Sequence, residues 1–310
     1  MLDIFSIVLP IFLIILLGYF CRTSGKLSEH AAAELNKAVV WVFLPALLFK
    51  ICATSHISEI WNTGFVISYV MGCIVVFTAI LFWRVWQKHS LVTASIDGLS
   101  AAYANTGYVG IPLCVLIFGE FGLKPAMIAT LIVVVVVFAV SVTLIEFALQ
   151  QKGHVFATLR HVILALLKNP IVIAPILGFM WAATGHQIAT PWLHLLDMLA
   201  VATSPCALIS LGLFLAQKQI SVQTRSFIPL VFAKLIIQPL ITAFFAIVIF
   251  KLPTAWANSA IILSALPTGT GPYMLAELYK TDAKTISQSI LWSTILSVFT
   301  LSALLMIFNL

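Results

Sequence analysis

The chain is built almost entirely of apolar stretches about as long as a lipid bilayer is thick, separated by short polar turns. A helix needs about 20 mostly apolar residues to cross the hydrocarbon core. Only one polar connection, residues 150–168, is long. The pattern predicts transmembrane helices at residues 3–20, 31–52, 61–83, 94–118, 125–149, 170–185, 192–216, 226–250, 255–279 and 285–308.

Two of these stretches contain residues that interrupt a helix. Residues 104–113 read ANTGYVGIPL, and residues 266–273 read LPTGTGPY. Glycine costs backbone entropy, and proline lacks an N–H and clashes with the preceding turn. In lipid, an interrupted helix is tolerated only where protein or a water-filled cavity surrounds it. Interrupted spans at corresponding places in two halves of a chain point to the substrate site of a transporter.

The ten stretches divide into two sets of five that match in order. Pro45 in the second stretch corresponds to Pro205 in the seventh, 160 residues later, and Asn105 corresponds to Pro267, 162 residues later. The alternative is a chance match of prolines. Because five is odd, the second set must insert upside down. The sequence therefore predicts an all-α membrane protein of ten transmembrane helices in two inverted five-helix repeats, residues 1–149 and 170–310, joined by a cytoplasmic linker at 150–169, with broken, crossing helices 4 and 9.

Composition agrees with membrane insertion and leaves little chain for a soluble domain. The chain is 62% hydrophobic and 8% charged, with a net charge of +6, whereas a soluble domain carries about 25% charged residues. The basic residues lie in short loops, which argues against a nucleic-acid partner. Eleven lysines and arginines fall in odd-numbered loops and three in even ones. The positive-inside rule then places the odd loops in the cytoplasm and both termini outside.

Enzymatic and metal-binding signatures are missing from the sequence. The five cysteines form no CxxC pair, and the seven histidines form no HxxxH or HExxH pattern. No P-loop and no GxSxG motif occurs. We therefore expect no enzyme activity, no metal and no cofactor, and we expect the lipid bilayer and a small solute as partners.

The two interruptions supply the candidate substrate groups. If both helices break inside the membrane and cross, each exposes the N-terminus of a second half-helix, expected near Pro112 and near Pro272. Helix N-termini favour anions, so a carboxylate suits the site. The alternative is that the glycines merely allow close helix packing. The candidate substrate-binding residues here are Asn105, Thr106, Gly107, Gly110, Pro112, Pro267, Thr268, Gly269, Thr270 and Pro272.

One lysine lies too deep to reach the membrane surface easily. Lys234 follows Arg225 by nine residues, about 13 Å along a helix. An intramembrane cation is a functional candidate by default. Its expected partner is a substrate carboxylate, Glu277 or Glu146, and a structural ion pair is the alternative.

Further polar residues lie inside or beside the apolar stretches. Asp97 and Glu277 are candidates for proton coupling, although a helix cap or an ion pair would also explain Asp97. Lys37 follows Glu34 by three residues, which favours a pair on one helix face, and the neighbouring Asn36 could face the bundle interior. Pro45 and Pro205 are expected to kink their helices.

At this point the motifs resemble a known family. Residues 105–113, NTGYVGIPL, resemble the N-x-G-[YF]-x-G-[IF]-P signature of the auxin efflux carrier family. Residues 35–37 with 44–47 resemble its second span, residues 234–240 its eighth, and residues 265–267 its ninth. The short central loop resembles the bacterial branch, which includes malonate and malate permeases.

The resemblance implies a secondary transporter with a scaffold part and a mobile transport part. It also implies a substrate site where helices 4 and 9 cross, a homodimer and elevator-like alternating access. The motifs carry this implication to Asn36, Pro45, Asn105, Gly107, Gly110, Pro112, Lys234 and Pro267. The expected cargo is a small organic anion, a mono- or dicarboxylate such as malonate or malate. A sodium-coupled carrier of the bile acid symporter type and a membrane sensor without transport activity stay open as alternatives.

Overall fold

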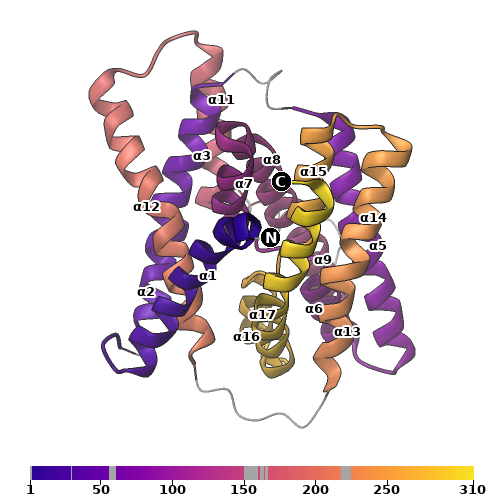
Figure 1. Cartoon of the computed structure of the whole chain (residues 1–310). Coiled ribbons are helices and arrows are strands. Elements are labelled where there is room, and N and C mark those ends of the chain that lie inside the picture. Colours follow the sequence, from indigo (N-terminus) through magenta and orange to yellow (C-terminus); the bar gives the residue numbers. More distant parts are fainter. Residues whose placement is uncertain are drawn as a thin grey trace. The chain divides into compact units, whose positions relative to one another are not determined.

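The structure is a computed structural model that describes residues 2–28, 30–55, 61–149, 160, 164, 167–217 and 225–310 (Figure 1), with side chains from residue 8 onward. The described chain is helical and contains no strand. The predicted linker at 150–169 lies largely outside the described residues. The helices are α1 (Leu2–Thr23), α2 (Ala31–Ala38), α3 (Leu44–Ala53), α5 (Thr63–Trp86), α6 (Leu91–Ala102), α7 (Ile111–Phe118), α8 (Leu123–Leu131), α9 (Phe138–Leu149), α11 (Pro170–Ala183), α12 (Thr190–Leu215), α13 (Ile228–Phe232), α14 (Gln238–Ala243), α15 (Thr254–Ser264), α16 (Gly271–Leu278) and α17 (Ala283–Phe308).

Six helices of the described chain are long and apolar enough to cross a membrane. Shorter apolar helices accompany them, among them Leu91–Ala102 and Pro170–Ala183. A helix of 12 residues is about 18 Å long and covers little more than half of the hydrocarbon core. The ten-span arrangement therefore stays a prediction. The six long runs are Ala31–Ala53, Thr63–Trp86, Thr106–Leu149, Thr190–Leu215, Ile228–Ile249 and Ala283–Phe308.

Three of the long helical runs widen into a π-helical turn just before a proline. The π-turns Val39–Phe43, Thr106–Gly110 and Ala233–Ile237 are followed after one residue by Pro45, Pro112 and Pro239. A proline ring clashes with the carbonyl four residues earlier and offers no N–H to it. A wider turn relieves both problems without ending the helix, and such turns are frequent at functional sites.

The contacts divide the chain into two compact units. Unit 1 comprises Met1–Asn62, Gly107–Met127 and Leu167–Lys218. Within it, α1 packs along α12 and α11 along α3 (Figure 1). The helices approach at glycines: a Cβ at Gly212 would lie 1.9 Å from the Ile15 carbonyl oxygen, and one at Gly178 would lie 2.6 Å from the Phe49 carbonyl oxygen. An ion pair between Lys50 and Asp197 joins α3 to α12.

Unit 2 comprises Thr63–Thr106, Ile128–Leu166 and Gln219–Leu310. Helix α5 packs against α6, α14 and α15, and α6 packs against α9. Gly98 on α6 permits a close approach to α5, because a Cβ there would lie 2.9 Å from the Phe77 carbonyl oxygen. The two stretches predicted to interrupt helices therefore both contribute to this unit, the first of them up to Thr106.

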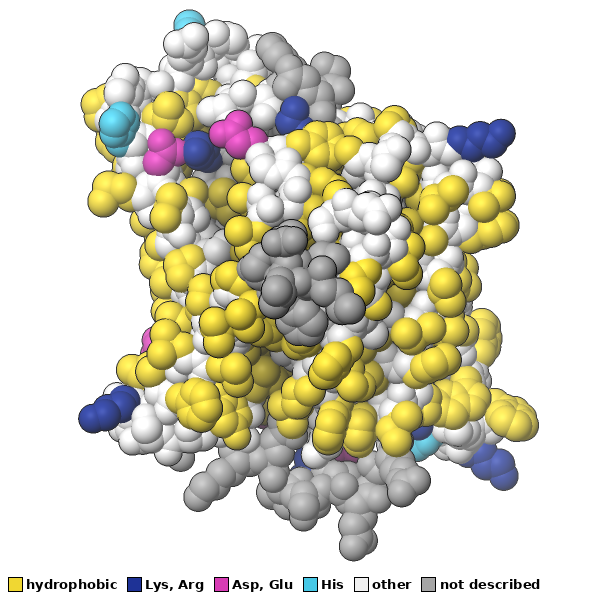
Figure 2. Space-filling view, in the orientation of Figure 1, with side chains coloured by type: hydrophobic (Ala, Val, Ile, Leu, Met, Phe, Trp, Pro, Cys, Tyr) yellow, Lys and Arg dark blue, Asp and Glu magenta, His cyan; other side chains and the backbone are white. Residues whose placement is uncertain are grey.

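The exposed helix faces carry large apolar side chains. Trp86, Val201 and Met198 are 81%, 76% and 75% exposed. On the face of the molecule that Figure 2 shows, yellow hydrophobic side chains predominate, whereas the dark blue lysine and arginine side chains are few and separate. In water such a surface would favour association, but in lipid it needs no cover. The surface therefore supports membrane embedding.

Gly212 should be required for the packing of α1 on α12. Replacing Gly212 by Ala places a methyl group against the Ile15 backbone, and overpacking of this kind costs about 1–3 kcal/mol. We expect a lower melting temperature of the purified protein in detergent. The control is Val201→Ala, at an exposed position of the same helix, which should leave the melting temperature nearly unchanged. Equal melting temperatures for both variants would contradict the packing argument.

Candidate functional site

Both predicted interruptions are present in the structure. Helix α6 ends at Ala102, residues 103–105 are non-helical, and helical structure resumes at Thr106. Helix α15 ends at Ser264, and α16 begins at Gly271 with Pro272 in its first turn. The expectation that the first half-helix starts near Pro112 is wrong. It starts six residues earlier, because the π-turn accommodates Pro112 inside the helix.

The two interruptions lie side by side and run antiparallel. Ala104 and Thr268 form an isolated antiparallel β-bridge. The Asn105 N–H donates to the Pro267 carbonyl at 2.8 Å, and the Gly269 N–H donates to the Tyr103 carbonyl at 2.9 Å. Two segments about 160 residues apart thus supply each other's backbone partners. This is the crossing that the sequence pattern predicts, and it is formed within unit 2.

The C-terminal end of α6 is capped by side chains from distant segments. The Thr268 hydroxyl donates to the Ser100 carbonyl at 3.0 Å, and the Gln238 Nε2 donates to the Ala102 carbonyl at 3.1 Å. The last carbonyls of a helix have no partner within it. These two side chains supply such partners where lipid could not.

The C-terminal end of α15 is capped in the same manner. The Tyr69 hydroxyl donates to the Leu263 carbonyl at 3.4 Å, and the Lys234 Nζ donates to the Ser264 carbonyl at 2.5 Å. The Thr268 N–H, just beyond this end, donates to the Ser293 Oγ of α17 at 3.0 Å. Both interrupted ends are therefore held by side chains from α5, α14, α17 and the π-turn at Ala233–Ile237.

Glycines in the second interruption lie against one aromatic ring. A Cβ at Gly269 would lie 2.9 Å from the Tyr103 ring, and one at Gly271 would lie 2.8 Å from it. The Tyr103 ring contacts Phe138 edge-on. Any larger residue at Gly269 or Gly271 would have to displace Tyr103 and, with it, the crossing.

Among the buried polar side-chain atoms without a hydrogen-bond partner in the described chain, two belong to neighbouring residues at the first interruption. They are the Asn105 Nδ2, on a residue 5% exposed, and the Thr106 Oγ1, on a residue 1% exposed. A buried donor without a partner costs about 1–3 kcal/mol. Each such group in a native structure calls for an explanation, and a ligand that accepts from both would provide one.

Lys234 is fully buried, as its depth in the sequence predicts, but its partner differs from those expected. The Nζ lies on the Ser264 carbonyl. Glu146 instead accepts a hydrogen bond from the Tyr279 hydroxyl at 2.6 Å, and Glu277 is exposed. Neither glutamate pairs with Lys234, because the end of α15 offers a closer partner.

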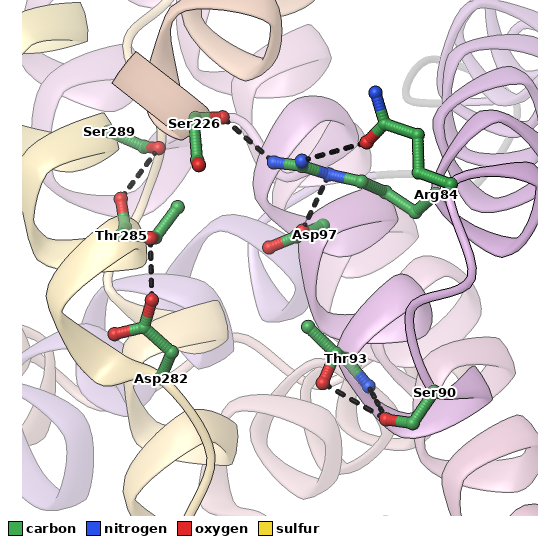
Figure 3. Close-up of polar contacts among 9 residues, drawn as sticks. Arg84, Ser90, Thr93, Asp97, Ser226, Asp282, Thr285 and Ser289 are labelled. Carbon is green, nitrogen blue, oxygen red and sulfur yellow. Dashed lines mark hydrogen bonds and ion pairs between the residues drawn. The ribbon is translucent and has the colours of Figure 1, made fainter. Parts of the chain in front are cut away.

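Asp97 belongs to a buried ion pair, one of the two structural roles that the sequence left open. Its Oδ2 lies 2.8 Å from the Arg84 Nε, and the two side chains are 6% and 4% exposed (Figure 3). The Arg84 guanidinium also donates to the Ser226 carbonyl at 2.8 Å. The pair thereby joins α5, α6 and the turn before α13. Asp282, also labelled in Figure 3, caps α17 by accepting from the Lys284 N–H at 3.1 Å, and it also accepts from the Thr285 hydroxyl at 2.7 Å.

Other predicted residues lie in unit 1. The Tyr108 hydroxyl donates to the half-buried Asn36 Oδ1, so Asn36 does face a neighbouring segment. The predicted Lys37–Glu34 pair is confirmed at 2.7 Å, and both side chains are largely exposed. Gly107, Gly110 and Pro112 belong to this unit as well. Pro205 lies within the continuous helix α12, and its kink stays a prediction.

Thr270 is half-buried beside the crossing and precedes Gly271.

No group of three or more histidine, cysteine, aspartate or glutamate side chains suited to a metal ion occurs in the described part of the chain.

Lys234 and Thr268 were predicted as site residues, whereas the other residues that hold the crossing were not. Gln238 carried a usable signal, because it is an amide inside an apolar stretch, four residues after Lys234. Tyr69, Tyr103 and Ser293 carried none, since apolar spans commonly contain such residues. Only the contacts show what they hold.

Comparison with known proteins agrees with these observations. A sequence profile of the membrane transport protein family, which is the family of the auxin efflux carriers, matches residues 3–305. The chain belongs to this family. The resemblance noted in the motifs is thereby confirmed, and so is a transporter in a membrane.

Three similar proteins indicate how widely the family is spread. A Rhizobium meliloti protein named "Putative malonate transporter" is 29% identical over 98% of this chain and 96% of its own length. An uncharacterized transporter of Methanocaldococcus jannaschii is 27% identical over 96% of both chains. The uncharacterized transporter YfdV of Escherichia coli is 28% identical over 75% of this chain and 74% of its own.

The Thr268 hydroxyl should stabilise the crossing. Thr268→Val keeps the side-chain shape but leaves the Ser100 carbonyl without this donor, which costs about 1–3 kcal/mol. We expect a lower melting temperature in detergent. Thr270→Val is the matched control, because the Thr270 hydroxyl makes no hydrogen bond with the described residues. The assignment of Thr268 as a cap would be wrong if both variants had the same melting temperature.

The main role of the Arg84–Asp97 pair should be to stabilise the folded protein. Asp97→Asn leaves the buried Arg84 without its counter-charge, and breaking a buried pair costs about 3–5 kcal/mol. We expect a marked loss of thermal stability, partly restored in the double variant Arg84→Met/Asp97→Leu. A stable Asp97→Asn protein with altered pH dependence of uptake would instead favour proton coupling.

Proposed function

We propose that the protein is a permease for a small organic anion, a mono- or dicarboxylate such as malonate or malate, in a bacterial inner membrane. The observation that carries this proposal is the pair of buried, unpartnered donors at the crossing, Asn105 Nδ2 and Thr106 Oγ1. Around them, the ends of α6 and α15 are already capped by protein groups. The free donors are therefore available to a ligand.

A carboxylate suits these donors in both charge and geometry. A carboxylate only accepts hydrogen bonds, and an amide N–H and a hydroxyl can each donate one. Hydrogen bonds to a charged acceptor are about twice as strong as neutral ones. The buried Lys234 caps the end of α15 at Ser264, three residues before Pro267, and adds a positive charge beside the second interruption. The name of the Rhizobium meliloti relative supports malonate as the first anion to test.

The transport movement that we propose is an elevator-like exchange of access. Unit 2 contains the first interruption up to Thr106 and the whole of the second interruption. It also contains the segments that cap them. It would correspond to the transport part, and unit 1, built largely from α1, α2, α3, α11 and α12, to the scaffold. The family resemblance supports this division, a homodimer, and the crossed, inverted repeat of ten spans. It also supports periplasmic termini as the charge bias predicts.

Substitution of the free donors should weaken anion binding while the protein stays folded. Asn105→Ala and Thr106→Val each remove one donor, and a hydrogen bond to a charged group is worth about 1.5–3 kcal/mol. The affinity should fall about tenfold or more. The readout is the thermal shift produced by malonate, malate, oxalate, succinate and lactate, followed by uptake into proteoliposomes.

The control is Asn258→Ala, which makes the same change within α15. It should bind and transport like the parent protein. The proposed function would fail if no carboxylate stabilised the parent protein and none entered proteoliposomes under any ion gradient. The assignment of the site alone would fail if both donor variants transported normally.

A further inference from the structure

The ends of the two interrupted helices meet the side chains of one neighbouring segment. Lys234 lies in the π-turn Ala233–Ile237, and Gln238 begins α14 four residues later. Lys234 reaches the last carbonyl of α15, and Gln238 reaches the last carbonyl of α6. One short segment therefore caps both interrupted ends, one with a charge and one with a neutral amide.

The C-terminal end of a helix is a place that attracts cations. Its free carbonyls carry about half a negative elementary charge. In transporters with discontinuous helices, unwound carbonyls and half-helix C-terminal ends coordinate the coupling sodium ion or proton. An ion there must balance its lost hydration with oxygen ligands, and the end of α15 presents such oxygens inside the protein.

In this chain an ammonium group already lies at that place. The Lys234 Nζ is 2.5 Å from the Ser264 carbonyl oxygen, and the residue is 0% exposed. No carboxylate of the described chain forms an ion pair with it, and the hydrogen bond that it donates goes to a backbone carbonyl at a helix C-terminus. A second monovalent cation beside it would meet both electrostatic repulsion and an occupied carbonyl.

We propose that Lys234 is a resident cation that takes the place of a coupling sodium ion at the crossing, so that transport of the anion requires no sodium. The inference rests on the proposed function for its transport readout. It assigns to Lys234 a role in positioning the end of α15 and in setting ion dependence, and it separates this chain from a sodium-coupled carrier.

The π-turn contributes to this placement. It widens the helix at the buried lysine and is followed by Pro239, which cannot donate a backbone hydrogen bond. The turn therefore directs Lys234 and Gln238 to two different helix ends instead of one. Gln238 also contacts the Cys73 sulfur at 3.2 Å, which fixes the amide that caps α6.

The experiment compares the parent protein with Lys234→Met, Lys234→Arg and the control Gln238→Met. Met removes the charge at similar length, Arg retains it, and the control removes the neutral cap of the other helix end. Each purified variant is tested for malonate uptake in proteoliposomes with sodium, potassium or choline as the external cation. Its melting temperature is measured in sodium chloride and in choline chloride.

The parent protein should take up malonate at the same rate with each cation and show no sodium-specific thermal shift. Lys234→Met should lose about tenfold or more of the uptake in choline, and sodium should raise its melting temperature. Lys234→Arg should keep sodium-independent uptake. Gln238→Met should melt lower in both salts without gaining a sodium shift.

Sodium-dependent uptake or a sodium-specific thermal shift in the parent protein would overturn the inference. So would a folded Lys234→Met variant that transports at the parent rate or gains no sodium shift. If Lys234→Met does not fold, the parent protein and Lys234→Arg decide the question. The thermal measurements need no transport, so a parent protein that moves no anion would refute the proposed function while the resident cation is still tested.

Discussion

Backbone carbonyls without partners are the central constraint on this structure. A helix that stops inside lipid leaves its last carbonyls unbonded, and lipid offers no donor to them. Here two helices, α6 and α15, stop inside the protein, and their ends are brought together. Each supplies backbone partners to the other across the Ala104–Thr268 bridge. Further carbonyls at these two helix ends accept hydrogen bonds from the side chains of Thr268, Gln238, Tyr69 and Lys234.

The same constraint explains why few hydrogen-bond donors at the crossing are left without an acceptor. Several side-chain donors near the crossing already bond to the carbonyls at the helix ends. The donors without an acceptor are therefore conspicuous. The Asn105 Nδ2 and the Thr106 Oγ1 are among the buried polar atoms that have no hydrogen-bond partner within the described chain. The glycines at 269 and 271 leave room for the Tyr103 ring and not for a wide cavity.

The proline positions show how a helix can be bent without being broken. Pro45, Pro112 and Pro239 each follow a π-turn, which absorbs the missing hydrogen bond and the ring clash. At Pro112 this shifts the start of the half-helix to Thr106, contrary to the expectation from proline's preference for first turns. At Pro239 it directs Lys234 and Gln238 to different helix ends. Proline in these runs therefore shapes the site instead of delimiting it.

Much of this protein could be predicted from its sequence, because the physics involved is local. The length and apolarity of each stretch set the helices, and glycine and proline mark both interruptions, at residues 104–113 and 266–273. The depth of Lys234 follows from counting along one helix. Burial of a cation, the Lys37–Glu34 pair and the family itself were likewise accessible, since each depends on neighbouring residues or on motif spacing.

Only the tertiary structure decided which polar groups form hydrogen bonds and ion pairs with each other. The sequence could not show that Lys234 would meet the Ser264 carbonyl instead of Glu146 or Glu277, because every backbone residue carries a carbonyl and none is marked in the sequence. Nor could it pair Arg84 with Asp97, or Gln238 with the end of α6, since those contacts depend on how helices pack across long separations. Local pattern determines where helices begin and break, and packing determines which polar groups then find each other.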